Sequence, residues 1–100
     1  MKLVGVSQRV DIHSQRRETS DALDQRLVSW LSSCDFIPVP IPNVLGSGIR
    51  DWLNFLKPEA LVLSGGNDIG KYLHRDATEF AILSYAKDYS LPVLAICRGM

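Results

Sequence analysis

The sequence has no excess of charge of either sign, because its 100 residues include 11 lysines plus arginines and 11 aspartates plus glutamates. A neutral balance argues against a nucleic-acid-binding protein, which usually carries a basic face, and against an acidic solvating tail. The apolar runs are too short for a membrane span. The first residues lack the long apolar region of a signal peptide. We therefore expect neither a nucleic-acid partner nor a membrane partner.

Cysteine is also scarce, since the chain has only Cys34 and Cys97. Two cysteines do not make a disulfide framework, and neither has a His or Cys neighbour at the spacing of a zinc site. The simplest interpretation is a cytoplasmic protein with reduced thiols and without a metal or other cofactor. Cys34 ends an apolar helical face and is expected to pack in the core.

Short apolar runs alternate with helical patterns along the chain. Strand-like runs lie at residues 2–7, 36–42, 60–63 and 93–96. Helical patterns between them lie at about 21–33, at 49–56 and from about 76 to 89. This alternation predicts an α/β fold, a flavodoxin-like open parallel sheet with helices on both faces. The polar segment 8–19 is expected to be a loop.

Three alternate prolines, Pro38, Pro40 and Pro42, indicate the strand order. Each proline removes a backbone donor, and a central strand does not tolerate that loss. The run 36–42 therefore belongs at an edge of the sheet, and the order of the strands by chain position becomes 2-1-3-4. This order makes the third and fourth strands neighbours, so their carboxyl ends lie at the same edge.

Residue spacing gives further expectations for the helices. Ser20 is the expected N-cap of the first helix, and Trp30 is expected to pack from its apolar face. Asp76 and Glu79 have the spacing of a capping box at the start of the last helix. The buried stripe expected for that helix is Phe80, Leu83, Ala86 and Tyr89.

The last residues, from Leu91 to Met100, run from an apolar strand into Cys97. Small residues two places to each side, Ala95 and Gly99, let a strand and a following helix come close around a strained turn. This is the cysteine form of the nucleophile turn whose serine form is G-x-S-x-G. Cys97 is therefore the candidate nucleophile of an acyl-transfer site.

A pair of glycines, Gly65 and Gly66, follows the third strand. The predicted strand order places them beside Cys97 at the carboxyl edge, where open α/β sheets bind ligands. Acyl transfer needs N–H donors at the point where a carbonyl oxygen becomes negative. The N–H of Arg98 is one such donor, and glycine lets the backbone after the third strand supply another.

The segments Leu63–Asp68, Arg75–Glu79 and Pro92–Met100 resemble the class I glutamine amidotransferase-like superfamily. They look most like its γ-glutamyl hydrolase (peptidase C26) branch, which includes γ-glutamyl-γ-aminobutyrate hydrolases. The likeness covers essentially the whole chain, and residues 1–100 resemble the amino-terminal part of that domain, apparently truncated at the nucleophile turn. The sequence departs from the pattern at Ala95, where the family usually has glycine.

The resemblance implies a cysteine-dependent hydrolase. Cys97 is then the group that attacks the γ-amide carbonyl of glutamine or another γ-glutamyl compound, forming a glutamyl thioester that water hydrolyses. Gly66 and Arg98 are implied to supply the N–H groups of the oxyanion hole. The candidate substrate-binding residues are Gly65, Asn67 and Asp68.

Family members activate the cysteine with a His that is oriented by a Glu or a similar acid, both well downstream of the nucleophile. His13 and His74 lie upstream and do not match, so this 100-residue chain alone is expected to be inactive. Three functions stay open. They are a glutaminase domain that feeds ammonia to a synthetase partner or fused domain, a stand-alone hydrolase of γ-glutamyl peptides or amines, and a catalytically incomplete fragment or non-catalytic binding subunit.

Overall fold

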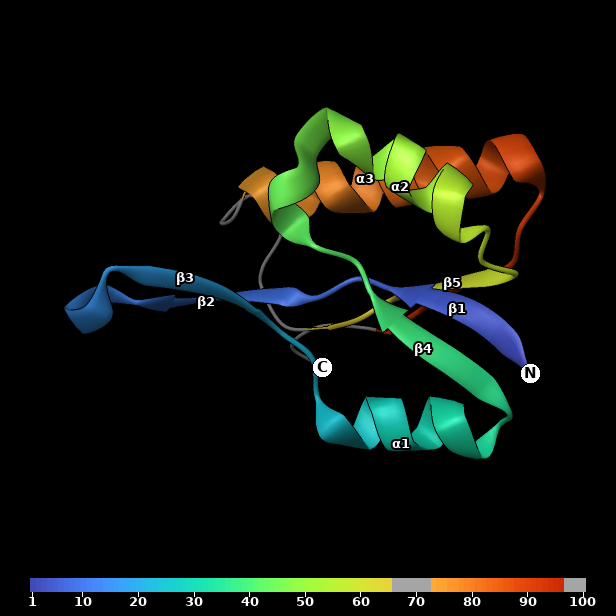
Figure 1. Ribbon diagram of the computed structural model, residues 1–100, viewed down its shortest axis with the longest axis horizontal. Helices are drawn as coiled ribbons and strands as arrows, with labels where there is room; N and C mark the ends of the chain where they lie inside the picture. The colour runs from blue at the N-terminus through green and yellow to red at the C-terminus, as the bar shows by residue number, and fades with distance from the viewer. Residues whose placement is uncertain (66–72, 97–100) are drawn as a thin grey trace.

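The computed structural model describes residues 1–65 and 73–96. Within these residues a four-stranded parallel sheet carries helices on both faces (Figure 1). Its strands are β1 (Lys2–Val6), β4 (Phe36–Pro40), β5 (Ala60–Leu63) and β6 (Val93–Ala95). They pair in the order β4-β1-β5-β6, which is 2-1-3-4 in chain order. The predicted order is therefore confirmed, with the proline-containing strand at the edge.

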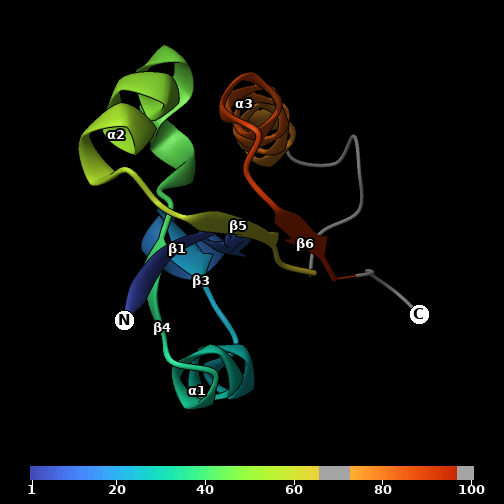
Figure 2. The same cartoon turned by 90° about the vertical axis from the view of Figure 1, so that its right-hand side faces the viewer.

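The helices cover the two faces unequally (Figure 2). α1 (Gln25–Ser33) lies on one face, whereas α2 (Ile49–Leu56) and α3 (Leu73–Tyr89) lie side by side on the other. The 3₁₀ helix η2 (Asn43–Gly48) leads into α2. This arrangement confirms the predicted α/β fold.

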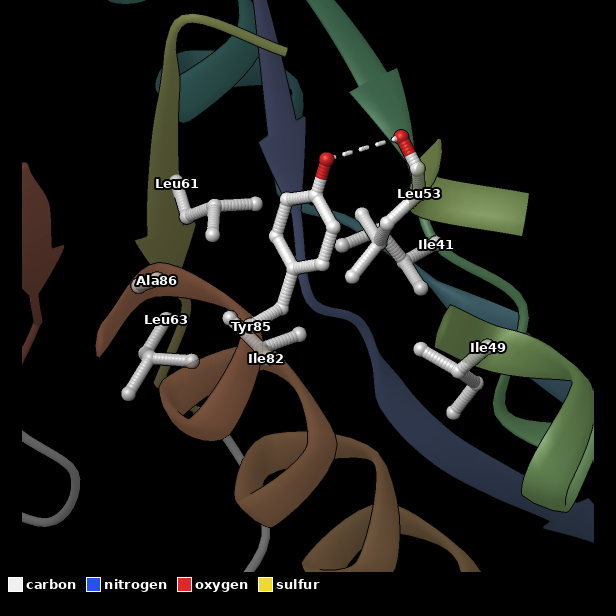
Figure 3. Close-up of a cluster of buried hydrophobic side chains, with 8 residues drawn as sticks. All are labelled: Ile41, Ile49, Leu53, Leu61, Leu63, Ile82, Tyr85 and Ala86. Carbon is white, nitrogen blue, oxygen red and sulfur yellow. Dashed lines mark hydrogen bonds between the residues drawn. The ribbon is translucent and has the colours of Figure 1, made fainter. Parts of the chain in front are cut away.

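The larger core lies between the sheet and the pair α2 and α3 (Figure 3). Tyr85 fills its centre and donates a hydrogen bond from its hydroxyl to the carbonyl oxygen of Leu53 at 3.3 Å. Burial raises the pKa of the Tyr85 phenol. The buried members of this core are Ile41, Ile49, Leu53, Leu61, Leu63, Ile82, Tyr85 and Ala86. The smaller core under α1 contains Val4, Val6, Leu31 and Val62.

The segment 8–19 contains strands, so the prediction of a loop is wrong. β2 (Arg9–His13) and β3 (Glu18–Ala22) form an antiparallel hairpin, joined by the 3₁₀ helix η1 (Ser14–Arg16). The apolar alternation of β2 rests on Val10 and Ile12 alone, which is a weak signal among so many charged residues. The hairpin extends beyond the carboxyl edge of the sheet (Figure 1).

The first helix begins later than expected, because its N-cap is Asp24 and not Ser20. The Asp24 carboxylate accepts a hydrogen bond from the backbone N–H of Arg26 at 2.8 Å. The hydrogen bond from the Arg26 side chain lowers the pKa of that carboxyl. Ser20 lies in β3, where the hairpin takes it away from the helix.

Cys34 and Trp30 are exposed, although both were expected to pack in the core. Cys34 is the C-cap of α1 and lies beyond its last helical residue, so the helical period no longer points its side chain inward. Leu31 is the buried residue of this helix. The apolar face of α1 is therefore narrower than the sequence indicates.

The buried face of α3 also differs from the prediction. The buried residues are Arg75, Thr78, Ile82, Tyr85 and Ala86. The expected stripe is wrong at Phe80, Leu83 and Tyr89, which are exposed. The expected stripe is based on hydropathy. The face that meets the sheet instead begins with two polar side chains, Arg75 and Thr78. The helix also includes Leu73, so Asp76 is not its first residue.

Gly5 lies within β1 where the sheet meets the larger core. A methyl group added there meets Leu61 Cδ2 at 2.9 Å and Ile41 Cδ1 at 3.2 Å. Both partners are fully buried. We expect Gly5→Val to lower the free energy of unfolding by about 2 kcal/mol, because overpacking forces these side chains away from their preferred rotamers.

Urea denaturation measures this effect, with Gly48→Ala as the matched control. A methyl group at Gly48 meets no atom within 4 Å among the described residues beyond its chain neighbours. Gly48 also has right-handed helical backbone angles, so alanine fits there without strain. Equal denaturation midpoints for the two variants would contradict the close packing at Gly5.

Candidate active site

Of the predicted site residues, Gly65 lies within the described part of the chain, and it is partly exposed. The other predicted site residues lie outside residues 1–65 and 73–96. These are Gly66, Asn67, Asp68, Cys97 and Arg98. The structure therefore describes the strand ends that lead to them and the groups around those ends.

The strands that lead to the two predicted segments end side by side. β5 and β6 pair in parallel, with Leu63 opposite Ala95. The backbone N–H of Ile96 donates to the carbonyl oxygen of Leu63 at 2.8 Å. Ser64 and Ile96 thus stand at equivalent levels of the carboxyl edge, and the next residues in the sequence are Gly65 and Cys97.

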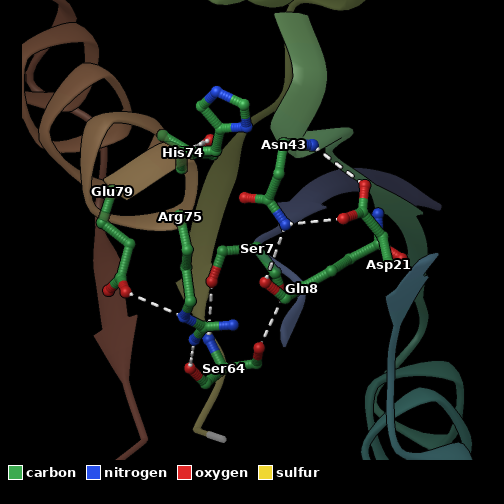
Figure 4. Close-up of polar contacts among 9 residues, drawn as sticks. Ser7, Gln8, Asp21, Asn43, Ser64, His74, Arg75 and Glu79 are labelled. Atoms are coloured by element: carbon green, nitrogen blue, oxygen red, sulfur yellow. Dashed lines mark hydrogen bonds and ion pairs between the residues drawn. The ribbon is translucent and has the colours of Figure 1, made fainter. Parts of the chain in front are cut away.

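A buried pair of serines ties the end of β5 to the end of β1 (Figure 4). The backbone N–H of Ser64 donates to Ser7 Oγ at 2.9 Å, and Ser64 Oγ donates to the carbonyl oxygen of Ser7 at 2.6 Å. Buried polar groups that satisfy each other in this way rigidify the backbone that carries them. The pair therefore fixes the chain immediately before Gly65.

Arg75 reaches the same strand end from α3 (Figure 4). Its side chain is fully buried. The guanidinium donates from Nη2 to the carbonyl oxygen of Ser64 and from Nε to Glu79 Oε1, the latter at 3.2 Å. Removing a guanidinium from water costs on the order of several kcal/mol, so these acceptors have to compensate the burial. Arg75 therefore anchors the first turns of α3 to the backbone next to Gly65.

Sequence reasoning missed this role of Arg75 and assigned Glu79 to a capping box. Hydropathy places an arginine at the surface, because arginine is rarely buried without a partner. The signal that could have indicated the pair is its i,i+4 spacing on one helix face.

Asn43 links the hairpin to the residue that follows β1 (Figure 4). Its Nδ2 donates to Asp21 Oδ1 at 2.9 Å and to the carbonyl oxygen of Gln8 at 3.1 Å. Its backbone N–H donates to Asp21 Oδ2 at 3.0 Å. Gln8 Nε2 in turn donates to the carbonyl oxygen of Ile41 at 3.0 Å. These bonds fix the hairpin against the ends of β1 and β4.

Asp21 and Asn43 also line a cleft of about 670 Å³ at the carboxyl edge. The hairpin, η2 and the start of α3 form its walls. Its lining residues are Val10, Ile12, Thr19, Asp21, Asn43, Val44, Leu73 and His74. The sequence did not predict this cleft, because the hairpin that forms one wall was taken for a loop.

The model of the Peptidase C26 family matches residues 2–100 of the sequence. The chain belongs to the Peptidase C26 family. The resemblance to the class I glutamine amidotransferase-like branch is thereby confirmed. A comparison with curated proteins gives no match.

Membership of Peptidase C26 places the chain in a hydrolase family and implies γ-glutamyl hydrolase-type activity on a γ-glutamyl substrate. The described ends of β5 and β6 immediately precede the two motif segments in the sequence. Among the helices that the structure describes, none has the length and apolar character needed to cross a membrane.

Proposed function

We propose that this Peptidase C26 chain carries the nucleophile half of a cysteine-dependent γ-glutamyl amide hydrolase. The observation that supports the proposal is the parallel pairing of β5 with β6, closed by the bond from Ile96 N–H to Leu63 O at 2.8 Å. The two motif segments of the sequence, Gly65-Gly66 and Cys97-Arg98, begin within two residues of this bond. Two neighbouring strand ends can thus present a nucleophile and backbone donors to one carbonyl group.

In the proposed reaction, the thiolate of Cys97 attacks the γ-carbonyl carbon and the π electrons move to the oxygen. The N–H groups of Gly66 and Arg98 receive this oxyanion. The C–N bond then breaks, and the amine leaves with the proton that the thiol gave to the base. Water then gives a proton to the base as its oxygen adds to the thioester carbonyl, the C–S bond breaks with its electron pair returning to sulfur, and glutamate is released. Losing one oxyanion donor typically costs about 3–4 kcal/mol of transition-state stabilisation.

The rigid groups behind Gly65 support this assignment. An oxyanion hole stabilises charge only when its donors are already in place before the reaction. Ser7 and Arg75 both bind Ser64, through its N–H, its hydroxyl and its carbonyl oxygen. The backbone next to Gly65 is therefore held from two sides, as a preorganised donor requires.

The assay that tests the proposal uses the natural polypeptide that contains these residues. We expect it to release glutamate from glutamine or from other γ-glutamyl amides, and not from matched α-glutamyl amides. We expect this specificity because membership of the Peptidase C26 family implies a γ-glutamyl substrate. A folded polypeptide that releases no glutamate from any γ-glutamyl amide would contradict the proposed function.

The 100-residue chain made by itself is expected to release no glutamate above its Cys97→Ser variant. The reason is that the base, a His oriented by an acid, is proposed to lie downstream of Cys97, and that neither His13 nor His74 takes its place. A sensitive enzyme-coupled glutamate assay on the two 100-residue polypeptides measures this. Turnover by the unsubstituted 100-residue chain would show that the base lies within it.

A further inference from the structure

The cleft beside the hairpin has no part in the reaction described above, although it lies within reach of the reacting strand ends. Asn43 in its wall is bonded to Gln8, and the neighbouring Ser7 is bonded to Ser64. Neighbouring strands lie about 5 Å apart, so the end of β4, two strands from β5, is roughly 10 Å from it. A substrate whose γ-carbonyl lies at the end of β5 and β6 can therefore extend a short chain into the cleft.

Large apolar side chains from three separate elements line this cleft. Ile12 on β2, Val44 on η2 and Leu73 on α3 are 58%, 79% and 75% exposed. Exposed apolar side chains that gather around one concave surface are typical of a binding site, whereas single ones are not informative. The lining is therefore suited to an apolar chain of a ligand.

The polar side chains of the lining are Thr19, Asp21, Asn43 and His74, and two of them, Asp21 and Asn43, present oxygen acceptors. Asn43 is 4% exposed, and its Oδ1 has no hydrogen-bond partner among the described residues. Its amide orientation is fixed, because Nδ2 donates to two acceptors, Asp21 Oδ1 and Gln8 O. The Oδ1 atom therefore points away from Asp21 (Figure 4).

A buried acceptor without a donor is costly and calls for an explanation. The Asp21 carboxylate in the same wall adds a negative charge, and a carboxylate can accept more bonds than the two it receives from Asn43. A ligand group that carries N–H donors and a positive charge complements both residues.

We infer that the cleft binds the leaving-amine portion of the substrate, and that this amine has a short aliphatic body and a distal ammonium group. The inference rests on the proposed function. We do not expect the glutamyl part of the substrate to occupy the cleft. Its α-carboxylate would then face the Asp21 carboxylate across an apolar lining. Glutamine leaves the cleft unused, since its leaving group is ammonia. The cleft therefore favours a stand-alone hydrolase of γ-glutamyl amines over a glutaminase domain.

The test compares three γ-glutamyl amides that share a four-carbon body, those of putrescine, butylamine and γ-aminobutyrate, with glutamine. Their distal groups are an ammonium, a methyl and a carboxylate. We expect kcat/KM of the natural polypeptide to be at least about tenfold higher for the putrescine amide than for the γ-aminobutyrate amide or for glutamine, a factor that corresponds to about 1.4 kcal/mol.

The variant Val44→Lys adds a positive charge to the cleft without touching the bonds of Asn43 and Asp21. We expect the ratio of kcat/KM for the putrescine amide to that for the γ-aminobutyrate amide to fall at least about tenfold in this variant. Phe55→Lys is the matched control, because Phe55 is 93% exposed on α2 and does not line the cleft. Phe55→Lys adds the same charge outside the cleft, so we expect it to keep the wild-type ratio of the two kcat/KM values.

Two negative results are distinguishable. Absence of glutamate release from every γ-glutamyl compound overturns the proposed function and this inference with it. Glutamate release at similar kcat/KM from all four compounds, or with a preference for glutamine, overturns the inference alone. Equal ratios of kcat/KM for the putrescine and γ-aminobutyrate amides in Val44→Lys and Phe55→Lys also overturn the inference alone.

Discussion

Replacing Cys97 by serine is expected to reduce glutamate release by the natural polypeptide by on the order of 10⁴-fold or more. A serine hydroxyl ionises far less readily than a thiol, so a base placed to activate a thiol generates little alkoxide. The groups that bind substrate stay in place, so KM is expected to change much less than kcat. Steady-state kinetics with a γ-glutamyl amide measure both constants.

Cys34→Ser is the matched control for this substitution. Cys34 is an exposed thiol at the end of α1, and it precedes the amino end of β4, at the edge of the sheet opposite the candidate site. The variant is expected to keep the wild-type kcat. A Cys97→Ser protein that retains more than a tenth of the wild-type kcat would remove Cys97 from the mechanism.

Replacing Arg75 by methionine is expected to lower the free energy of unfolding by about 3 kcal/mol. Methionine keeps much of the volume but removes the donors that Nε and Nη2 supply to Glu79 and to the carbonyl oxygen of Ser64. Both acceptors lie in a region that water reaches poorly, since the Glu79 side chain is 17% exposed and Ser64 is buried. Buried groups that lose a charged donor account for most of the cost.

Arg26→Met is the matched control, since Arg26 is also paired with a carboxylate, Asp24, but its side chain is 92% exposed. Exposed ion pairs contribute little, so the denaturation midpoint is expected to stay close to that of the wild type. The double variant Arg75→Met with Glu79→Gln is expected to recover part of the loss, because it also removes the partly buried carboxylate charge of Glu79. Equal midpoints for Arg75→Met and Arg26→Met would contradict the anchoring role of Arg75.

The sheet could be predicted from the sequence because a few residues constrain it strongly. Pro38 and Pro40 exclude a central position for β4, and the apolar run in β5 has the length of a buried strand. These are local signals, and they lead to the observed strand order. The hairpin could not be predicted in this way, because its strands carry few apolar residues and are defined by pairing with each other.

The supporting groups of the site were missed for a different reason. Ser7 and Ser64 are 57 residues apart in the sequence, and Asp21 and Asn43 are 22 apart. Nothing local marks such residues as partners, and each by itself has the character of a surface residue. Arg75 shows the same limit. Hydropathy alone predicts the wrong buried face for α3, because it places Phe80 inside and Arg75 outside.

The most direct test of the proposed chemistry is mass spectrometry of the natural polypeptide, quenched in acid during turnover of a γ-glutamyl amide. We predict a digest peptide that contains Cys97 and carries one added glutamyl group. The added group should disappear after treatment with hydroxylamine, which cleaves thioesters. Steady glutamate release with an unmodified Cys97 peptide, or with the glutamyl group on another residue, would contradict the assignment of Cys97 as the nucleophile.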